Sequence, residues 1–416
     1  MSHPTHSARA VLALRDFRLF VATRFLAVVA YQMVGVAVGW QIYDLTRAPL
    51  YLGYAGLAEF LPAFLLALPA GQAADRFDRR LLLAFCLLGQ WSAALALLVL
   101  AVRPAPAVTA IFAVVALTGM ARAFLAPATQ SLLPRLVPLE VFPRAVALSS
   151  TVMKVASIAG PALGGLLYVW GPAAVYAAAA VLTATAMWSA TRLRARPARS
   201  TATGIAAAKG AEGLDGLLAG VRYVWSRKDI LGAVSLDLFA VLLGGATALL
   251  PVYARDILHV GPAGLGLLRG APSIGAAAMA LVLARRPLER AAGAKLFAAV
   301  VVFGLATIVF GLSRSFMVSL AALAVLGAAD MVSVVVRQTL VQLRTPDAMR
   351  GRVSAVNWVF IGASNELGEF ESGLTAAWFG TVPAVVLGGL GTLAVAALWA
   401  WRFPELRRVD GLADGV

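Results

Sequence analysis

Twelve apolar segments, each about as long as a membrane-spanning helix, constrain this chain more than any other feature of its sequence. A helix needs roughly 20 mostly apolar residues to cross the hydrocarbon core of a bilayer. Because 61% of the residues are hydrophobic and only 13% are charged, the chain cannot cover a soluble surface with polar groups. The sequence therefore predicts an all-α membrane protein and excludes a cytosolic enzyme, a nucleic-acid-binding domain and a disordered chain. The segments run approximately over residues 17–45, 51–73, 81–101, 107–133, 144–168, 172–191, 230–256, 262–284, 294–313, 316–343, 351–379 and 381–403.

Only one connection between these segments is long, and it divides the chain in two. It is rich in Arg, Ala and Gly and contains one amphipathic stretch, residues 213–225. We therefore expect an N-terminal six-helix bundle over residues 1–191, a cytoplasmic linker with an amphipathic segment over residues 192–229, and a C-terminal six-helix bundle over residues 230–416.

The basic residues indicate how the chain is oriented in the membrane. The net charge is +15, and arginine and lysine gather in alternate connections, as they do on the cytoplasmic side of membrane proteins. The opposite connections hold only Arg47, Arg103, Arg255 and Arg314. The pattern predicts a multi-pass membrane protein with both termini in the cytoplasm. The positive charge is then an insertion signal and indicates no nucleic-acid partner.

The two halves of the sequence resemble each other. Arg24 and Asp237 align in the first helix of each half, and Pro62 and Pro272 align in the second. Duplicated halves of this kind form two pseudo-symmetric bundles that rock around a central cavity. Five further residues recur 208 positions later: Gly119, Gln130, Pro138, Arg144 and Ala147 as Gly327, Gln338, Pro346, Arg352 and Ala355.

The loop between the second and third helices reads GQAADRFDRR over residues 71–80. This resembles the loop signature of the major facilitator superfamily, G-x-x-x-D-R-x-G-R-R, with Asp78 in place of the second glycine. The resemblance implies a transporter fold, and it implies a cytoplasmic latch built from Gly71, Asp75, Arg76, Arg79 and Arg80. The alternative is an ordinary basic cytoplasmic loop without a latch.

A second motif, ASIAGPALGG over residues 156–165, lies in the fifth helix. It is similar to a motif associated with proton-coupled exporters of the same superfamily, with Ala156 in place of the first glycine. Small residues at Gly160, Gly164 and Gly165 let helices approach closely, and Pro161 bends the helix. Generic small-residue packing would produce the same pattern.

Nearly the whole chain resembles the exporter branch of this superfamily that includes the enterobactin exporter. The resemblance rests on the two motifs, on Phe17-Arg18 with Arg24-Phe25, and on TPDAMRGR over residues 345–352. It implies export of a small organic molecule, either siderophore-like or drug-like, across the bacterial cytoplasmic (inner) membrane.

Eleven ionisable residues fall inside the predicted helices. Each would cost about 2.5–3.5 kcal/mol at the bilayer centre, so most must pair with an opposite charge or line a wet cavity. The repeat aligns three pairs of opposite charges: Arg24 with Asp237, Glu59 with Arg269, and Arg122 with Asp330. The Glu59–Arg269 pair is close enough to the outer surface to act as a gate. The alternative is that each charge pairs within its own half. The eleven are Arg24, Glu59, Arg122, Lys154, Asp237, Arg269, Asp330, Arg337, Glu366, Glu369 and Glu371.

The eleventh helix carries a polar stripe, because Gly362, Asn365, Glu366, Glu369 and Ser372 share one helical face. Burial raises the pKa of a carboxyl group and so lets it carry a proton. Glu366 and Glu369 are therefore the first candidates for proton coupling, and Asp330 is the next. The alternative is that these carboxylates only pair with arginines.

These observations predict a secondary active transporter that exports a small organic molecule by alternating access, with proton antiport. The chain has no nucleotide-binding loop and no hydrolase motif, so we expect neither ATP use nor enzymatic activity. We expect no cofactor and no metal. The expected partners are the substrate, protons and the lipid bilayer, and the expected state is a monomer. The alternatives are an uptake or uniport carrier, or a receptor or scaffold with the same fold and no transport.

Overall fold

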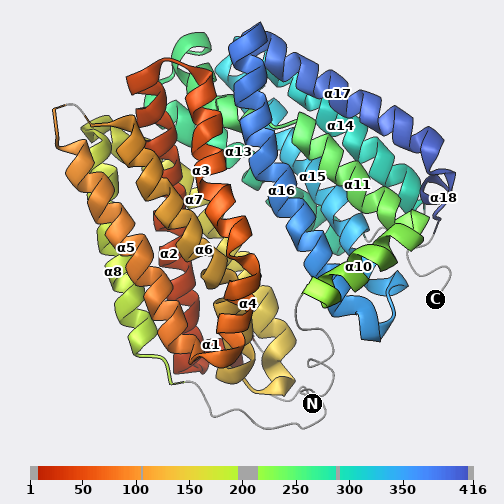
Figure 1. Ribbon diagram of the computed structural model, residues 1–416, viewed down its shortest axis with the longest axis horizontal. Helices are drawn as coiled ribbons and strands as arrows, with labels where there is room; N and C mark the ends of the chain where they lie inside the picture. Colours follow the sequence, from red (N-terminus) through yellow and green to blue (C-terminus); the bar gives the residue numbers. More distant parts are fainter. Residues whose placement is uncertain (1–7, 105, 195–213, 287–290, 411–416) are drawn as a thin grey trace. The chain divides into compact units, whose positions relative to one another are not determined.

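The computed structural model describes residues 8–104, 106–194, 214–286 and 291–410, and these residues form helices and no strand (Figure 1). The predicted all-helical fold is confirmed. The helices of the first half are α1 (Ala8–Ala13), α2 (Arg15–Thr46), α3 (Pro49–Leu65), α4 (Ala67–Arg76), α5 (Arg79–Ala101), α6 (Val108–Leu136), η2 (Leu139–Val141), α7 (Phe142–Leu167), η3 (Tyr168–Trp170) and α8 (Pro172–Thr191). Those of the second half are α10 (Leu214–Ser226), α11 (Lys228–Leu243), η4 (Ala246–Leu249), α12 (Leu250–Val252), η5 (Tyr253–Ile257), α13 (Gly261–Arg285), α14 (Ala292–Leu312), α15 (Phe316–Arg344), α16 (Asp347–Phe379), α17 (Thr381–Arg402) and α18 (Pro404–Arg407).

Within the described residues, ten helical segments are long and apolar enough to cross a membrane. The other two predicted spans differ from them for identifiable reasons. The span over 51–73 is divided into α3 and α4 at Leu66, because Pro69 has no N–H to bond the Leu65 carbonyl and its ring crowds that group. The span over 351–379 lies in α16, whose 33 residues include three glutamates.

The predicted span over 230–256 is also interrupted. Its regular helix α11 ends at Leu243, before Gly244 and Gly245, and the chain then continues through η4, α12 and the π-helix η5. Glycine pairs and proline, here Pro251, are common causes of such breaks. At the break, the Gly245 carbonyl accepts a hydrogen bond of 3.3 Å from the Ala248 N–H and a second one of 3.1 Å from the Ser372 hydroxyl.

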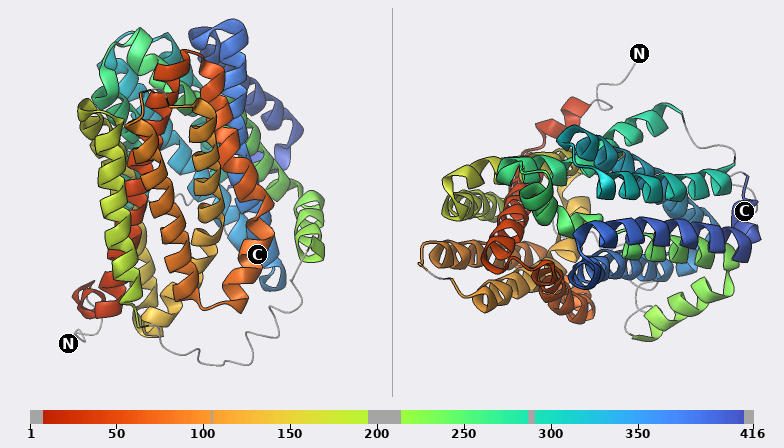
Figure 2. Two further views of the ribbon diagram at one scale, coloured as in Figure 1. Left: turned by 60° about the vertical axis from the view of Figure 1, so that its left-hand side comes forward. Right: turned by 90° about the horizontal axis from the view of Figure 1, so that it is seen from above.

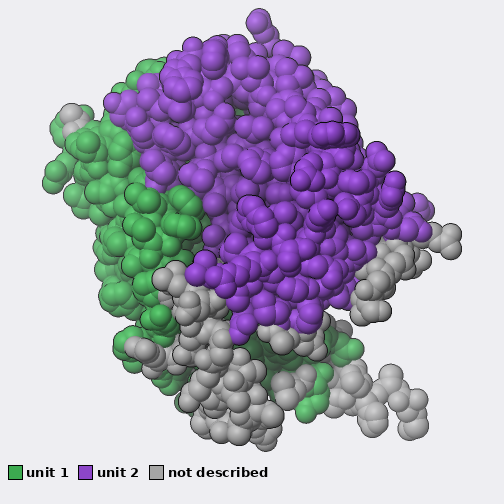
Figure 3. Space-filling model, turned by 45° about the vertical axis from the view of Figure 1, so that its right-hand side comes forward, with its two compact units in different colours: residues 1–47, 58–199, 260–270 green, residues 48–57, 200–259, 271–416 purple. Residues whose placement is uncertain are grey.

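The chain forms two compact units (Figure 3). Unit 1 contains residues 1–47, 58–199 and 260–270, and unit 2 contains residues 48–57, 200–259 and 271–416. Residues 48–57 come from the first half of the sequence and belong to unit 2, whereas residues 260–270 come from the second half and belong to unit 1. The first part of α3 packs on α16, where a Cβ atom on Gly53 would lie 3.0 Å from the Phe370 carbonyl oxygen.

The same helix pairings occur in both units (Figures 1 and 2). In unit 1, α2 packs against α7 and α8, and α5 packs against α6 and α8. In unit 2, α11 packs against α16 and α17, and α14 packs against α15 and α17. Equivalent turns precede α8 and α17, where Gly171 and Gly380 adopt φ values of 92° and 89° that favour glycine. The repeat seen in the sequence is therefore present in the packing.

The glycine repeated at positions 119 and 327 has the same role in each unit. A Cβ atom on Gly119 would lie 2.1 Å from the carbonyl oxygen of Glu59 on α3. A Cβ atom on Gly327 would lie 1.9 Å from the carbonyl oxygen of Pro272 on α13. Both distances are far shorter than van der Waals contact, so only glycine fits at either helix crossing.

The predicted amphipathic segment of the linker forms α10, which packs against α16. Val224 on α10 joins a small buried cluster that includes Ile230, Val341 and Val353. Linker residues 195–213 lie outside the described part of the chain.

Candidate functional site

Three side chains from three helices meet inside unit 1. The Tyr31 hydroxyl on α2 donates a hydrogen bond of 2.7 Å to the Glu59 carboxylate on α3. Arg122 on α6 forms an ion pair with the same carboxylate oxygen. The Arg122 guanidinium also lies 4.7 Å from the centroid of the Tyr31 ring, which is a cation–π contact. Each charge at membrane depth thus has an opposite charge beside it, which offsets part of its burial cost.

Arg24 on α2 has a different environment. Its Nη1 donates a hydrogen bond of 2.8 Å to the Ser149 hydroxyl on α7, and its guanidinium lies 5.7 Å from the Phe20 ring centroid. Within the described residues, no carboxylate contacts Arg24. Because Ser149 is on a neighbouring helix, the Arg24 side chain points into unit 1 and not along α2 toward a membrane surface.

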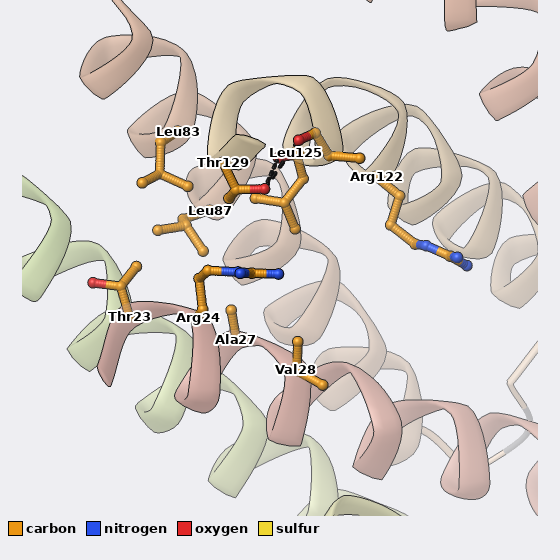
Figure 4. A pocket seen from close by; sticks show the side chains of 10 residues that line it. Thr23, Arg24, Ala27, Val28, Leu83, Leu87, Arg122, Leu125 and Thr129 are labelled. Atoms are coloured by element: carbon orange, nitrogen blue, oxygen red, sulfur yellow. Dashed lines mark hydrogen bonds between the residues drawn. The ribbon is translucent and has the colours of Figure 1, made fainter. Parts of the chain in front are cut away.

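Arg24 and Arg122 both line a cavity of about 190 Å³ between α2, α5 and α6 (Figure 4). Figure 4 shows Arg24 extending from α2 into the space that Leu87 and Thr129 face. The remaining walls are mostly apolar, with Leu83 and Leu87 from α5. The cavity therefore has a positive polar part and an apolar part.

Unit 2 contains a buried ion pair. Arg337 on α15, whose side chain is only 2% exposed, places Nη2 3.1 Å from Asp237 Oδ2 on α11. Its Nη1 donates a hydrogen bond of 2.9 Å to the Asn357 side-chain oxygen on α16. The Ser333 hydroxyl donates a hydrogen bond of 3.3 Å to Asp237. Removing one partner of such a pair is much more costly than replacing both, because it leaves a buried charge uncompensated.

The predicted polar stripe lies along α16. Glu366 and Glu369 are half-buried, Asn365 is exposed and Ser372 is buried. A Cβ atom on Gly56 of α3 would lie 3.0 Å from a Glu369 carboxylate oxygen, so this carboxylate packs against α3.

Glu371 lies off the stripe and accepts a hydrogen bond of 2.7 Å from the Thr375 hydroxyl one turn along α16. Its position on the helix therefore differs from that of Glu366 and Glu369, which share the striped face.

Four charges that the repeat aligned as opposite pairs have other partners in this structure. Arg24 contacts Ser149 and Asp237 contacts Arg337, while Glu59 contacts Arg122. Arg269 on α13 donates a hydrogen bond of 3.2 Å to the Gly35 carbonyl on α2. Glu59 and Asp237 thus follow the alternative in which a charge pairs within its own half, because a neighbouring helix brings a partner within side-chain reach.

The remaining two charged candidates lie on separate helices. Lys154 is exposed on α7, and Asp330 is half-buried on α15.

In the predicted latch loop, Asp78 has a clear local role. Its carboxylate accepts a hydrogen bond of 2.8 Å from the Arg80 backbone N–H and so caps the N-terminus of α5. The φ of Asp78 is −61°, so the turn does not require the glycine of the family signature.

The other latch residues are divided between two helices. Gly71, Asp75 and Arg76 belong to α4, and the side chains of Asp75 and Arg76 lie outside the described part of the chain. On α5, Arg79 Nε donates to the Ala74 carbonyl at 3.3 Å. Arg80 Nη1 donates to the Leu193 carbonyl at 2.8 Å, which ties the loop to the end of α8.

The small residues of the α7 motif contact two different helices. Cβ atoms on Gly160 and Gly164 would lie 2.5 Å from Gln32 Cβ and 2.8 Å from Met33 Cα, both on α2. A Cβ atom on Gly165 would lie 2.4 Å from the carbonyl oxygen of Pro262, which precedes Gly266 on α13. Pro161 is buried within the same helix. The motif is thus a close-packing site with helices on two sides.

Ser149, Asn357 and Asp229 hold arginines in place, but their residue types alone did not indicate this. Ser149 and Asn357 lie 208 positions apart, two residues beyond the aligned Ala147 and Ala355, so a longer alignment of the two halves would have matched them with each other. Asp229 at the start of α11 accepts a hydrogen bond of 2.8 Å from Arg344 Nη1 and contacts Arg227. The hydrogen bonds to Asp229 raise the pKa of Arg227. No sequence spacing links Asp229 to Arg344.

A family model described as transmembrane secretion effector matches residues 6–413. The chain is 27% identical over 400 residues to the enterobactin exporter EntS of Citrobacter koseri and 26% identical to that of Shigella boydii. Each match covers 94% of this chain and 92% of the relative.

Solved transporter structures share the fold at low sequence identity. The nucleoside transporter NupG matches with a TM-score of 0.74 at 12% identity, over 93% of this chain and 100% of that chain. A bacterial homologue of the human lysosomal transporter Spinster, in an inward-facing and occupied conformation, matches with a TM-score of 0.73 at 13% identity, over 98% and 99% of the two chains. The chain is therefore a multi-pass membrane transporter and not an enzyme, and it belongs to the transmembrane secretion effector family of the major facilitator superfamily.

Proposed function

We propose that this transporter exports a small organic molecule by alternating access and that inward movement of protons drives the export. The observation that carries the proposal is the pair of half-buried carboxylates, Glu366 and Glu369, on one face of α16. A transporter that carried substrate without coupling would have no need to keep two acidic groups at this depth, where each is costly.

Glu369 is the stronger candidate for coupling because it packs against Gly56 of α3. Adding or removing a proton there changes the charge at a helix contact, and an ion can shift a conformational equilibrium only through such a difference between states. Glu366 lies three residues before Glu369 on the same face of α16 and is the second candidate. Asp330 on α15 is the third.

The direction and substrate are supported by the relatives. Both relatives named above are enterobactin exporters, so we propose export, and we propose a siderophore-like molecule ahead of a drug-like one. We propose that the protein is a monomer in the bacterial inner membrane, since both relatives named above are bacterial. The charge distribution of its connections supports a cytoplasmic position for both termini.

Proteoliposomes test the proposal. With the purified protein reconstituted, addition of enterobactin or ethidium should produce proton movement opposite to the probe, reported by a pH-sensitive dye trapped in the lumen. Glu369→Gln and Glu366→Gln should retain probe binding. In each variant, the rate of probe transport driven by a pH gradient should fall at least tenfold. Glu371→Gln is the matched control, since it removes a carboxylate from the same helix but not from the stripe.

Each outcome discriminates between functions. Probe movement without proton movement in the unmodified protein would indicate a uniport carrier, and proton movement in the same direction would indicate uptake by symport. No movement of either probe, with binding retained, would favour a receptor or scaffold. Normal pH-driven movement in both glutamine variants would assign coupling to another group, with Asp330→Asn the next variant.

A further inference from the structure

Both units contain a pocket at the same place in the repeat. The pocket of unit 1 has a volume of about 190 Å³, and its counterpart in unit 2 has a volume of about 10 Å³. The two share five aligned lining positions, namely Arg24 with Asp237, Ala27 with Ala240, Val28 with Val241, Arg122 with Asp330, and Leu125 with Ser333. The same architectural position is thus open in one unit and nearly filled in the other.

The charge at these positions is reversed between the units. Unit 1 presents two arginines where unit 2 presents two aspartates. In unit 2 the protein itself supplies the opposite charge, because Arg337 pairs with Asp237 and is held by Asn357.

Unit 1 lacks the corresponding compensation. The residue aligned with Arg337 is Thr129, which has no charge, and the residue aligned with Asn357 is Ser149, the neutral hydrogen-bond partner of Arg24. Arg122 is paired with Glu59, so of the two arginines that line the cavity only Arg24 has no carboxylate partner in the described part of unit 1. An open, partly apolar cavity beside such a guanidinium is suited to an external anion.

We propose that the unit 1 cavity binds an anionic group of the transported molecule, a carboxylate or a phenolate on an aromatic ring, with Arg24 as its partner. Drug-sized ligands occupy pockets of roughly 300–1,000 Å³, so this cavity holds one acidic group of a larger substrate. Ser149 positions the guanidinium, and Leu83 and Leu87 contact the ring. The inference rests on the transport function proposed above and narrows its substrate class.

The test uses three probes of nearly equal size and different charge: benzoate, benzamide and benzamidine. Each is titrated into the full-length protein in phosphatidylcholine nanodiscs, and binding is measured by calorimetry and by the shift in thermal unfolding. Benzoate should bind at least tenfold more tightly than the other two. Arg24→Gln should weaken benzoate binding at least tenfold, and Arg24→Lys should restore part of it. Arg18→Gln, which removes an exposed arginine from the same helix, should leave it unchanged.

A second variant keeps the test decisive if Arg24→Gln does not fold. The double substitution Arg24→Asp with Thr129→Arg copies the ion pair of unit 2 into unit 1 and should abolish benzoate binding in a folded protein. Equal binding of the three probes, or benzoate binding that survives both the single and the double substitution, would overturn the proposal. Loss of benzoate binding when phosphatidylglycerol is added would assign the site to lipid headgroups and also overturn it. If benzoate binding depends on Arg24 but the protein shows no proton-coupled flux, the anion site is supported and the proposed transport function is wrong.

Discussion

The charged residues inside these helices differ mainly in whether a neighbouring helix neutralises them. Asp237 and Arg337 neutralise each other and are almost fully buried. Among the residues that the structure describes, Arg24 contacts a serine hydroxyl and an aromatic ring but no carboxylate. Charged residues with an ion-pair partner and those without one therefore have different roles. A neutralised pair fixes helices to one another, and an arginine without a carboxylate is available to a ligand.

The buried pair of unit 2 predicts a strongly non-additive pair of substitutions. Asp237→Asn should destabilise the protein by about 3–5 kcal/mol, because it leaves Arg337 charged and buried. The double substitution Asp237→Asn with Arg337→Gln should recover part of that loss, as residues in one network do not act additively. Unfolding in detergent, followed by tryptophan fluorescence against denaturant, measures both. An additive double variant would show that the pair contributes no coupling.

The cap of α5 gives a prediction that involves the departure from the family signature. Asp78→Ala should destabilise the start of α5 by roughly 1 kcal/mol. Asp78→Gly should destabilise it by only a few tenths of a kcal/mol, since glycine is tolerated at an N-cap. Hydrogen exchange of the first turn of α5 reports the local effect. Equal exchange in the two variants would mean that the Asp78 carboxylate does not cap the helix.

At the scale of elements, the packing repeats more faithfully than the sequence does. Gly119 and Gly327 occupy the same crossing in the two units, and Gly171 and Gly380 make the same turn. Charge is kept at Arg144 and Arg352, but it is reversed between Arg122 and Asp330 and lost between Lys154 and Gly362. Close backbone approach and positive φ therefore restrict residue choice more tightly than charge does.

Replacing either crossing glycine should separate its two helices. Gly327→Ala places a methyl group 1.9 Å from the Pro272 carbonyl oxygen, so α15 and α13 must move apart. We expect a loss of several kcal/mol in unfolding free energy, comparable to a strongly overpacked core. Gly362→Ala is the control, because a Cβ there meets no atom within 4 Å. If Gly327→Ala has the same unfolding free energy as Gly362→Ala, the two helices do not cross at Gly327.

The positions of the helices could be predicted from the sequence. The breaks within helices and the partners of the charged side chains could be predicted only in part. Long apolar runs indicate spans because the bilayer requires them, and the predicted ends lie within a few residues of α5, α8 and α14. The break at Leu66 depends on the missing N–H of Pro69, which the length of the apolar run concealed. The partners of Glu59 and Arg24 could not be predicted, because hydropathy gives the depth of a residue but not the direction in which its side chain points.

For the whole molecule, the distribution of arginines predicts a topology that two single cysteines can test. The native Cys86 is buried, and replacing it with serine gives a background without thiols. Arg103→Cys and Arg408→Cys then place exposed thiols at predicted outer and inner positions. In intact spheroplasts a membrane-impermeant maleimide should label the first and not the second, and permeabilisation should allow both. Labelling of Arg408→Cys without permeabilisation would reverse the predicted orientation.

The unequal pockets of the two units also have a consequence for how this protein can change over generations. A duplicated scaffold lets one copy keep the interactions that hold its helices while the other copy accumulates substitutions that alter recognition. New cargo should therefore be acquired through changes around Arg24, Thr129 and Leu83, with Asp237, Arg337 and Asn357 retained. A library of variants confined to the first set should yield altered selectivity among properly inserted proteins, whereas the same diversity at the second set should yield mostly misassembled chains.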